Sequence, residues 1–291
     1  MKCAELKQNL NCAQNNSVSE DCVIDVNISD VILTPLTCAS IVNEILKGLL
    51  YQKSQIPYPY NFLKSLVDKK RKQTVEENKP INFTAVNHYR IVSSAYDTIE
   101  KVTNEIIKEF SENSSHIKEV IVVFGTTPQC PKEVFTINIS CLANDHLEIN
   151  HVNQLVKFRQ KILRNIFLSQ DWMDAIDASS VCTNTYVYLK KHVSDEDENR
   201  DNFFCPTKPL SFPSKLKHVK ILLNSDHSRD INCCRNLSVF EDNSESGIPT
   251  KRSRIMTSEN IDLPIRWYQS KDLLRGFKDC YVNKVSVSEL W

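Results

Sequence analysis

Cysteine and histidine side chains that could bind a metal ion gather in one short stretch of the C-terminal half: Cys205, His218, His227, Cys233 and Cys234. Thiolate sulfur and imidazole nitrogen are the ligands that zinc prefers, and a structural zinc site takes four of them in a tetrahedron. Such sites usually contain a Cys-x-x-Cys knuckle, which this stretch lacks, and adjacent cysteines rarely bind one tetrahedral ion. We therefore expect no metal site.

Two further groups could support catalysis or ion binding. Cys182 and His192 could form a thiol–imidazole pair, but no motif supplies the third group that orients such a histidine. A small buried thiol is the alternative that we favour for Cys182. The acidic run Asp195–Glu198 lacks the glycine and the terminal glutamate of a calcium loop, so we expect it to be solvated.

Common enzyme signatures are absent from the sequence. The four glycines, at positions 48, 125, 247 and 276, cannot build a Gly-x-Gly-x-x-Gly turn or a phosphate-binding P-loop. Neither His-Glu-x-x-His nor Gly-x-Ser-x-Gly occurs. These observations favour a protein that is not an enzyme and uses no cofactor.

The charge balance favours a protein as the partner. Lys plus Arg and Asp plus Glu both number 36, so no overall field attracts nucleic acid or an anionic membrane. Local basic runs do occur at Lys69–Lys72 and Lys251–Arg254, and we predict that both lie in loops. Nuclear import receptors could bind these runs, or the runs could simply be solvated.

Cysteine usage and the N-terminus predict a soluble intracellular protein. The 11 cysteines are odd in number and have no repeating spacing, which is atypical of a disulfide scaffold. The segment Met1–Gln14 has no apolar core of the kind that directs secretion, and the longest apolar run is Val120–Phe124.

Apolar periodicity predicts an α+β fold in which helices and strands are segregated. Three main helices are expected, at about Thr37–Lys53, Thr84–Ser111 and Leu147–Ser169, and a short helix should begin at Asn61 after Pro57 and Pro59. A mainly antiparallel sheet is expected from strands at Val120–Phe124, Val134–Cys141, Thr183–Lys190 and Lys215–Leu223, with an edge strand within Val26–Leu36. We predict a flexible tail over residues 1–25, then one domain over 26–291 with flexible loops near 69–82, 194–202 and 236–262.

The third helix has an unusually wide apolar face. At 100° per residue its apolar side chains spread over about 180°, whereas one core contact needs roughly 100°. Lys157, Lys161 and Arg164 line the remaining side. Either a partner binds part of this face, with the charged residues at its rim, or the helix lies between the sheet and a loop.

Three blocks in this order resemble the comet-type family of HORMA-like spindle-checkpoint proteins: Ile45–Tyr60, Glu119–Leu142 and Trp267–Phe277. Weaker likeness runs through Leu155–Lys190 and Phe203–Leu223. The resemblance implies a HORMA-like domain whose C-terminal segment is a mobile seat belt. It also implies binding to the closed form of the HORMA protein Mad-two.

The resemblance also indicates which residues bind. Tyr51 and Gln52 correspond to the family's Tyr-Gln pair, and Arg164 corresponds to its arginine, all of them contacts to the HORMA partner. Leu163 stands where the family has phenylalanine, so the apolar anchor is kept with less ring area. Pro206 corresponds to a proline that docks the Pch-type AAA+ ATPase, but Thr207 separates it from Lys208, whereas the family's lysine follows directly.

The function that the resemblance implies is that of a non-enzymatic adaptor. The chain would present closed Mad-two to the ATPase for conversion to the open form, which silences the spindle assembly checkpoint. This would take place in the nucleus and cytoplasm, and at the spindle or kinetochore in mitosis. The alternative is a HORMA module that clasps a foreign peptide with its own C-terminal belt. Under the adaptor reading, Lys284–Trp291 should pair as a strand in the place of that peptide and hold the belt closed.

Overall fold

The computed structural model describes residues 22–27, 33–72, 83–113, 117–139, 152–177, 181–193, 202–224 and 264–290. The helices are α1 (Pro35–Gln52), α2 (Tyr60–Lys72), α3 (Phe83–Asn113), α4 (Val152–Phe167), α5 (Gln170–Ile176) and the 3₁₀-helix η5 (Val287–Leu290). The strands are β1 (Cys22–Asn27), β2 (Ile117–Thr127), β3 (Cys130–Ile139), β4 (Asn184–His192), β5 (Phe204–Thr207), β6 (Lys217–Asn224), β7 (Ile265–Ser270), β8 (Leu274–Arg275), β9 (Tyr281–Val282) and β10 (Val285–Ser286). None of the described helices combines the length and apolar character needed to cross a bilayer.

The main sheet has the strand order β1-β6-β3-β2-β4-β7-β5, and β8 pairs with the end of β4. Most neighbours are antiparallel, including the β2–β3 hairpin that the sequence predicts. The exceptions are the parallel pairs β1–β6 and β3–β6. β6 lies beside β3 and not beside β5, the strand that directly precedes it in the sequence. It runs parallel to β3.

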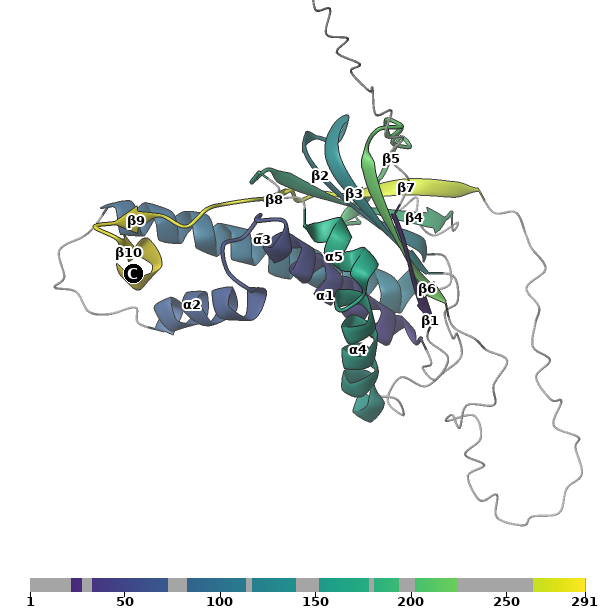
Figure 1. Cartoon of the computed structure of the whole chain (residues 1–291), viewed down its shortest axis with the longest axis horizontal. Coiled ribbons are helices and arrows are strands. Elements are labelled where there is room, and N and C mark those ends of the chain that lie inside the picture. The colour runs from purple at the N-terminus through teal and green to yellow at the C-terminus, as the bar shows by residue number, and fades with distance from the viewer. Residues whose placement is uncertain are drawn as a thin grey trace, which may run out of the picture.

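Helices α1, α3, α4 and α5 pack against one face of this sheet (Figure 1). Side chains alternate along each strand, so Val120, Val122 and Phe124 of β2 face the helices while Ile121 and Val123 face the other way. α3 contributes an apolar stripe to this core, in which Val92, Ile99 and Phe110 are fully or almost fully buried. The opposite face carries a smaller apolar cluster that includes Tyr186, Tyr188 and Leu216.

α3 extends beyond the edge of the sheet, and its projecting end lies beside α2 and the β9–β10 hairpin (Figure 1). The last turn of α2 contains Lys69–Lys72, a run that the sequence analysis wrongly places in a loop. Cations are favourable at this position because the carbonyl end of a helix carries partial negative charge. Arg71 also donates two hydrogen bonds to the Asp97 carboxylate on α3, at 2.7 and 2.8 Å.

Two other sequence predictions need correction. β1 begins at Cys22, so Cys22–Asp25 belong to an edge strand of the sheet rather than to a tail that reaches residue 25. Helix α5 and strand β5 are not predicted, because each has fewer than eight residues and carries no periodic signal over so short a length. The predicted loops near 194–202 and 236–262 lie almost wholly outside the described residues.

The C-terminal segment does not form the single strand that is predicted over Lys284–Trp291. Only Val285 and Ser286 are extended, and they pair with Tyr281 and Val282 in a small separate hairpin. Residues Val287–Leu290 form a 3₁₀ turn instead. The segment is nevertheless docked, since Val287 is fully buried and its backbone N–H donates to the Cys280 carbonyl at 2.8 Å.

Candidate functional site

The end of α1 places Tyr51 and Gln52 at the surface beside a sharp turn. Ser54 has a φ of 54°, and the backbone N–H of Lys53 donates to the Leu49 carbonyl at 2.8 Å. A left-handed residue just after a helix allows the last carbonyls to be capped. This cap ends the helix at Gln52, before the chain reaches Pro57 and Pro59.

A hollow of about 610 Å³ lies next to this turn. Its walls come from three segments far apart in the sequence: the end of α1, Cys182 before β4, and the C-terminal residues Phe277–Asp279. Tyr51 is 44% exposed, and the buried Oε1 atom of Gln52 has no hydrogen-bond partner among the described residues. Tyr51 is therefore the member of this pair that is open to a partner.

Gln55 joins the segments that surround this hollow. Its Oε1 atom accepts from the Thr183 backbone N–H at 2.7 Å, and its Nε2 atom donates to the Lys53 carbonyl at 2.6 Å. The backbone N–H of Phe277 donates to the Gln55 carbonyl at 2.8 Å. The turn after α1 therefore positions both the start of β4 and the C-terminal segment.

Gly276 makes this close approach possible, and its replacement by Ala should destabilise the protein. A Cβ atom there would lie 2.6 Å from Cys182 Sγ and 2.8 Å from both Gln55 Oε1 and the Thr183 carbonyl. These contacts are too short, and the carbonyl cannot rotate away, so we expect Gly276→Ala to cost about 1–3 kcal/mol. Urea denaturation measures this cost. An unchanged midpoint would contradict the packing, and Gly48→Ala, where the nearest atom is 3.1 Å away in the Phe167 ring, is the milder comparison.

α4 carries the other candidate contact residues. Ile162 and Ile166 are buried in the core, whereas Lys157, Lys161 and Arg164 are exposed. Leu163 is half-buried and packs against the rim of the core, and Val156 is 48% exposed. Part of the wide apolar face is therefore covered by the fold and part is open to solvent.

The packing of α1 on α4 fixes where Gln52 lies relative to Leu163. Arg159 Nη1 donates to Ser40 Oγ at 3.0 Å, and the Phe167 ring lies over Gly48. Leu163 is one turn before Phe167, and Gln52 is one turn after Gly48. The two residues thus lie on opposite sides of that contact, each roughly 5 Å from it along its helix, and a single patch would require a partner that spans both turns.

Pro206 and Lys208 lie at the far edge of the sheet. Pro206 is in β5, which pairs with β7 on one side and ends the strand order. Both residues are exposed. Proline is tolerated there because an edge strand can lose one N–H donor without breaking a ladder.

The alternative chemical sites find no support in the described part of the chain. No group of three or more His, Cys, Asp or Glu side chains is placed there to bind a metal ion, while His227, Cys233 and Cys234 lie outside it. Cys182 lies just before β4 and His192 is its last residue, so they are ten residues or roughly 33 Å apart. Burial also raises the pKa of the Cys182 thiol, which lowers its fraction of thiolate. Asp195–Glu198 and Lys251–Arg254 lie outside the described residues.

Together these features define a class of protein: an α+β protein whose helices cover one face of a mostly antiparallel sheet, as in a HORMA-like fold. Residues 4–226, more than half of the chain, match the p31comet family, which is described as Mad1 and Cdc20-bound-Mad2 binding. The chain belongs to this family. It is also similar to the MAD2L1-binding protein of Homo sapiens, with 30% identity over 108 residues, which are 36% of this chain and 38% of the human protein.

The C-terminal wall of the hollow is not predicted by the sequence. Phe277 closes the third block that carries the family resemblance, but Lys278 and Asp279 have no signal of their own. Their position depends on hydrogen bonds between segments separated by more than two hundred residues, and local patterns contain no information about such pairs.

Proposed function

We propose that this chain is a non-enzymatic adaptor that binds the closed form of Mad2 (Mad-two) and presents it to a Pch-type AAA+ ATPase. The ATPase converts closed Mad2 to the open form, which silences the spindle assembly checkpoint in the nucleus and at the mitotic spindle or kinetochore. The observation that carries the proposal is membership of a family described by its binding to Mad2 in complexes. The exposed part of α4 and the Tyr51–Gln52 turn provide a surface for that partner.

The separation of the two predicted surfaces supports a role as an adaptor. α4 contacts β1 at one edge of the sheet, and Pro206 lies in β5 at the other edge. Six strand spacings lie between these edges, or roughly 29 Å along the sheet at about 4.8 Å each. Mad2 on α4 and an ATPase on β5 could therefore bind at the same time without competing.

The alternative, a module that clasps a foreign peptide, is less favoured by the described residues. β7 is hydrogen-bonded to β4 on one side and to β5 on the other, so a foreign strand cannot pair with it without displacing one of them. The strand that could serve as the belt is thus already paired on both sides within the chain.

A binding measurement with the two forms of Mad2 tests the proposal. Isothermal titration calorimetry with Mad2 locked in the closed form should give binding at least about tenfold tighter than with Mad2 locked open. Adding the ATPase and ATP to the complex should then yield open Mad2. Equal affinity for the two forms, or no binding to either, would overturn the proposal.

A further inference from the structure

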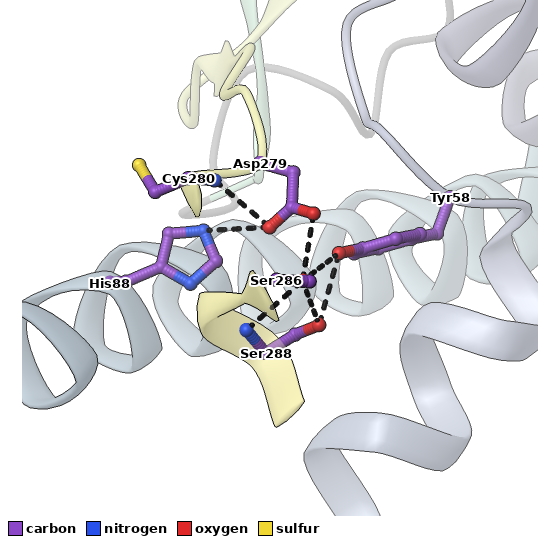
Figure 2. Close-up of polar contacts among 6 residues, drawn as sticks. All are labelled: Tyr58, His88, Asp279, Cys280, Ser286 and Ser288. Carbon is purple, nitrogen blue, oxygen red and sulfur yellow. Dashed lines mark hydrogen bonds and ion pairs between the residues drawn. The ribbon is translucent and has the colours of Figure 1, made fainter. Parts of the chain in front are cut away.

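A cluster of hydroxyl groups fixes the C-terminal segment to the turn that follows α1 (Figure 2). Tyr58 Oη lies 3.2 Å from Ser286 Oγ and 3.1 Å from Ser288 Oγ, and the two serine oxygens are 2.6 Å apart. Ser286 donates to Asp279 Oδ2 at 2.8 Å. Three hydroxyls from two distant parts of the chain thus converge near one carboxylate.

Asp279 is the charged centre of this cluster. Its side chain is only 7% exposed, and Oδ1 accepts the Cys280 backbone N–H at 2.9 Å and lies 3.8 Å from His88 Nε2 on α3. A buried carboxylate is stable only where donors surround it. Burial and the neighbouring Asp279 raise the pKa of Tyr58, which keeps the phenol protonated and able to donate a hydrogen bond.

The same aspartate also forms part of the hollow beside Gln52. Phe277, Lys278 and Asp279 make up one wall of it. This wall is held on its N-terminal side where the Gly276 N–H donates to the Thr183 carbonyl at 3.0 Å, and on its C-terminal side by the hydroxyl cluster. Loss of the cluster would remove these hydrogen bonds and leave the C-terminal side of the wall held mainly by the packing of the buried Val287.

We propose that Tyr58, Ser286 and Ser288 are positioning residues for the partner site: they hold the Phe277–Asp279 wall against the Tyr51–Gln52 turn, so the state of the C-terminal segment controls binding at that turn. The inference rests on the proposed binding of Mad2 at Tyr51 and Gln52. A preformed wall lowers the ordering cost of binding, whereas a detached wall must be ordered when the partner arrives.

Ser286→Glu is the strongest test of this role. The new carboxylate would lie next to the Asp279 carboxylate, and two buried like charges repel each other. Asn283→Asp is the matched control, because it adds the same single negative charge to the same segment at an exposed residue. Its φ of 52° is tolerated by both Asn and Asp.

Hydrogen–deuterium exchange gives a readout that does not depend on the partner. In Ser286→Glu, the amides of Phe277 and Val287 should exchange at least about tenfold faster than in Asn283→Asp, while the amides of α1 should be unchanged. Affinity for closed Mad2 should fall about tenfold in the same variant. Tyr58→Phe should shift both measurements in the same direction by a smaller factor, and it replaces Ser286→Glu if that variant does not fold.

The outcomes separate this inference from the proposed function. Unchanged exchange at Phe277 and Val287 in Ser286→Glu and Tyr58→Phe would overturn the positioning role. Faster exchange with unchanged affinity for Mad2 would also overturn it, because the wall would then be loosened without effect on binding. If the unmodified chain does not bind Mad2 at all, the proposed function fails, and the exchange data alone decide whether the cluster holds the wall.

Discussion

Replacing Leu163 by Glu is expected to abolish measurable binding to closed Mad2 while leaving the fold intact. Leu163 is half-buried at the rim of the core on the predicted partner face of α4. In a complex, a carboxylate at this position would be removed from water without a counter-ion. A loss of about 2–4 kcal/mol, or roughly 30- to 900-fold in Kd, is typical of a central interface residue. Isothermal titration calorimetry measures the change.

Asn165→Glu is the matched control for this substitution. It places the same carboxylate on α4 at an exposed residue about 160° around the helix from Leu163, away from the predicted partner face. Leu163→Ala removes the apolar contact without adding charge and should weaken binding less. Because Leu163 also touches the core, the melting temperature of each variant is compared with that of the unmodified protein. Full affinity in a folded Leu163→Glu protein would place the Mad2 surface elsewhere.

The long helices and the central strands are the parts of the fold that the sequence predicts well. The stripe from Val92 to Phe110 repeats at steps of three and four within α3, a helix of 31 residues, and a period is clear over such a length. The run Val120–Phe124 is continuous and apolar because both faces of the sheet are covered at its centre.

The C-terminal segment shows where local patterns fail. The alternation of Val285 and Val287 with Ser286 and Ser288 resembles a strand, and it predicts correctly that the segment is docked. The two serines, however, direct their hydroxyls to Tyr58, about 230 residues earlier in the chain, and this contact favours a short hairpin and a 3₁₀ turn. A tertiary hydrogen bond of this kind overrides the local preference.

The residues of the candidate site could be predicted from the sequence, but their arrangement in space could not. The family resemblance assigns Tyr51, Gln52, Leu163 and Arg164 to the binding of Mad2, and these assignments stay predictions. The structure adds that Gln52 and Leu163 lie two turns apart across the α1–α4 contact. The sequence could not show this, because the register of the two helices depends on the Phe167 ring packing over Gly48.

Glu133→Gln is expected to cause the largest loss of stability, because it leaves a buried cation without its counter-ion. The Nζ atom of Lys53 lies 2.7 Å from Glu133 Oε2, and the Lys53 side chain is fully buried. Lys53 Nζ also donates to the Ala175 carbonyl at 3.1 Å. Removing one member of a buried ion pair costs about 3–5 kcal/mol. Since glutamine can still accept one hydrogen bond, we expect about 3 kcal/mol, or roughly 6–12 °C in melting temperature.

Glu119→Gln provides the matched control, because it breaks a pair of the same type that is partly exposed. Glu119 lies 3.3 Å from Lys190, and the side chains are 21% and 29% exposed. Such pairs contribute about 0–1 kcal/mol. If the two variants unfold at the same temperature, the Lys53–Glu133 pair is not the buried contact that the structure shows.

The pH dependence of the Glu133→Gln defect has a definite sign. Burial lowers the pKa of Lys53 below its usual 10.5, and Glu133 partly opposes that shift. Between the lowered pKa of the folded state and 10.5, the unfolded chain binds more protons, so the free energy of unfolding rises with pH. Without Glu133 the pKa of Lys53 in the folded state falls further. The pH range in which the free energy of unfolding rises with pH therefore begins at a lower pH. The difference in the free energy of unfolding between the variant and the unmodified protein should therefore shrink as pH rises from 7 towards 10. Urea denaturation across this pH range measures it. A constant difference would show that Lys53 keeps its proton by other means.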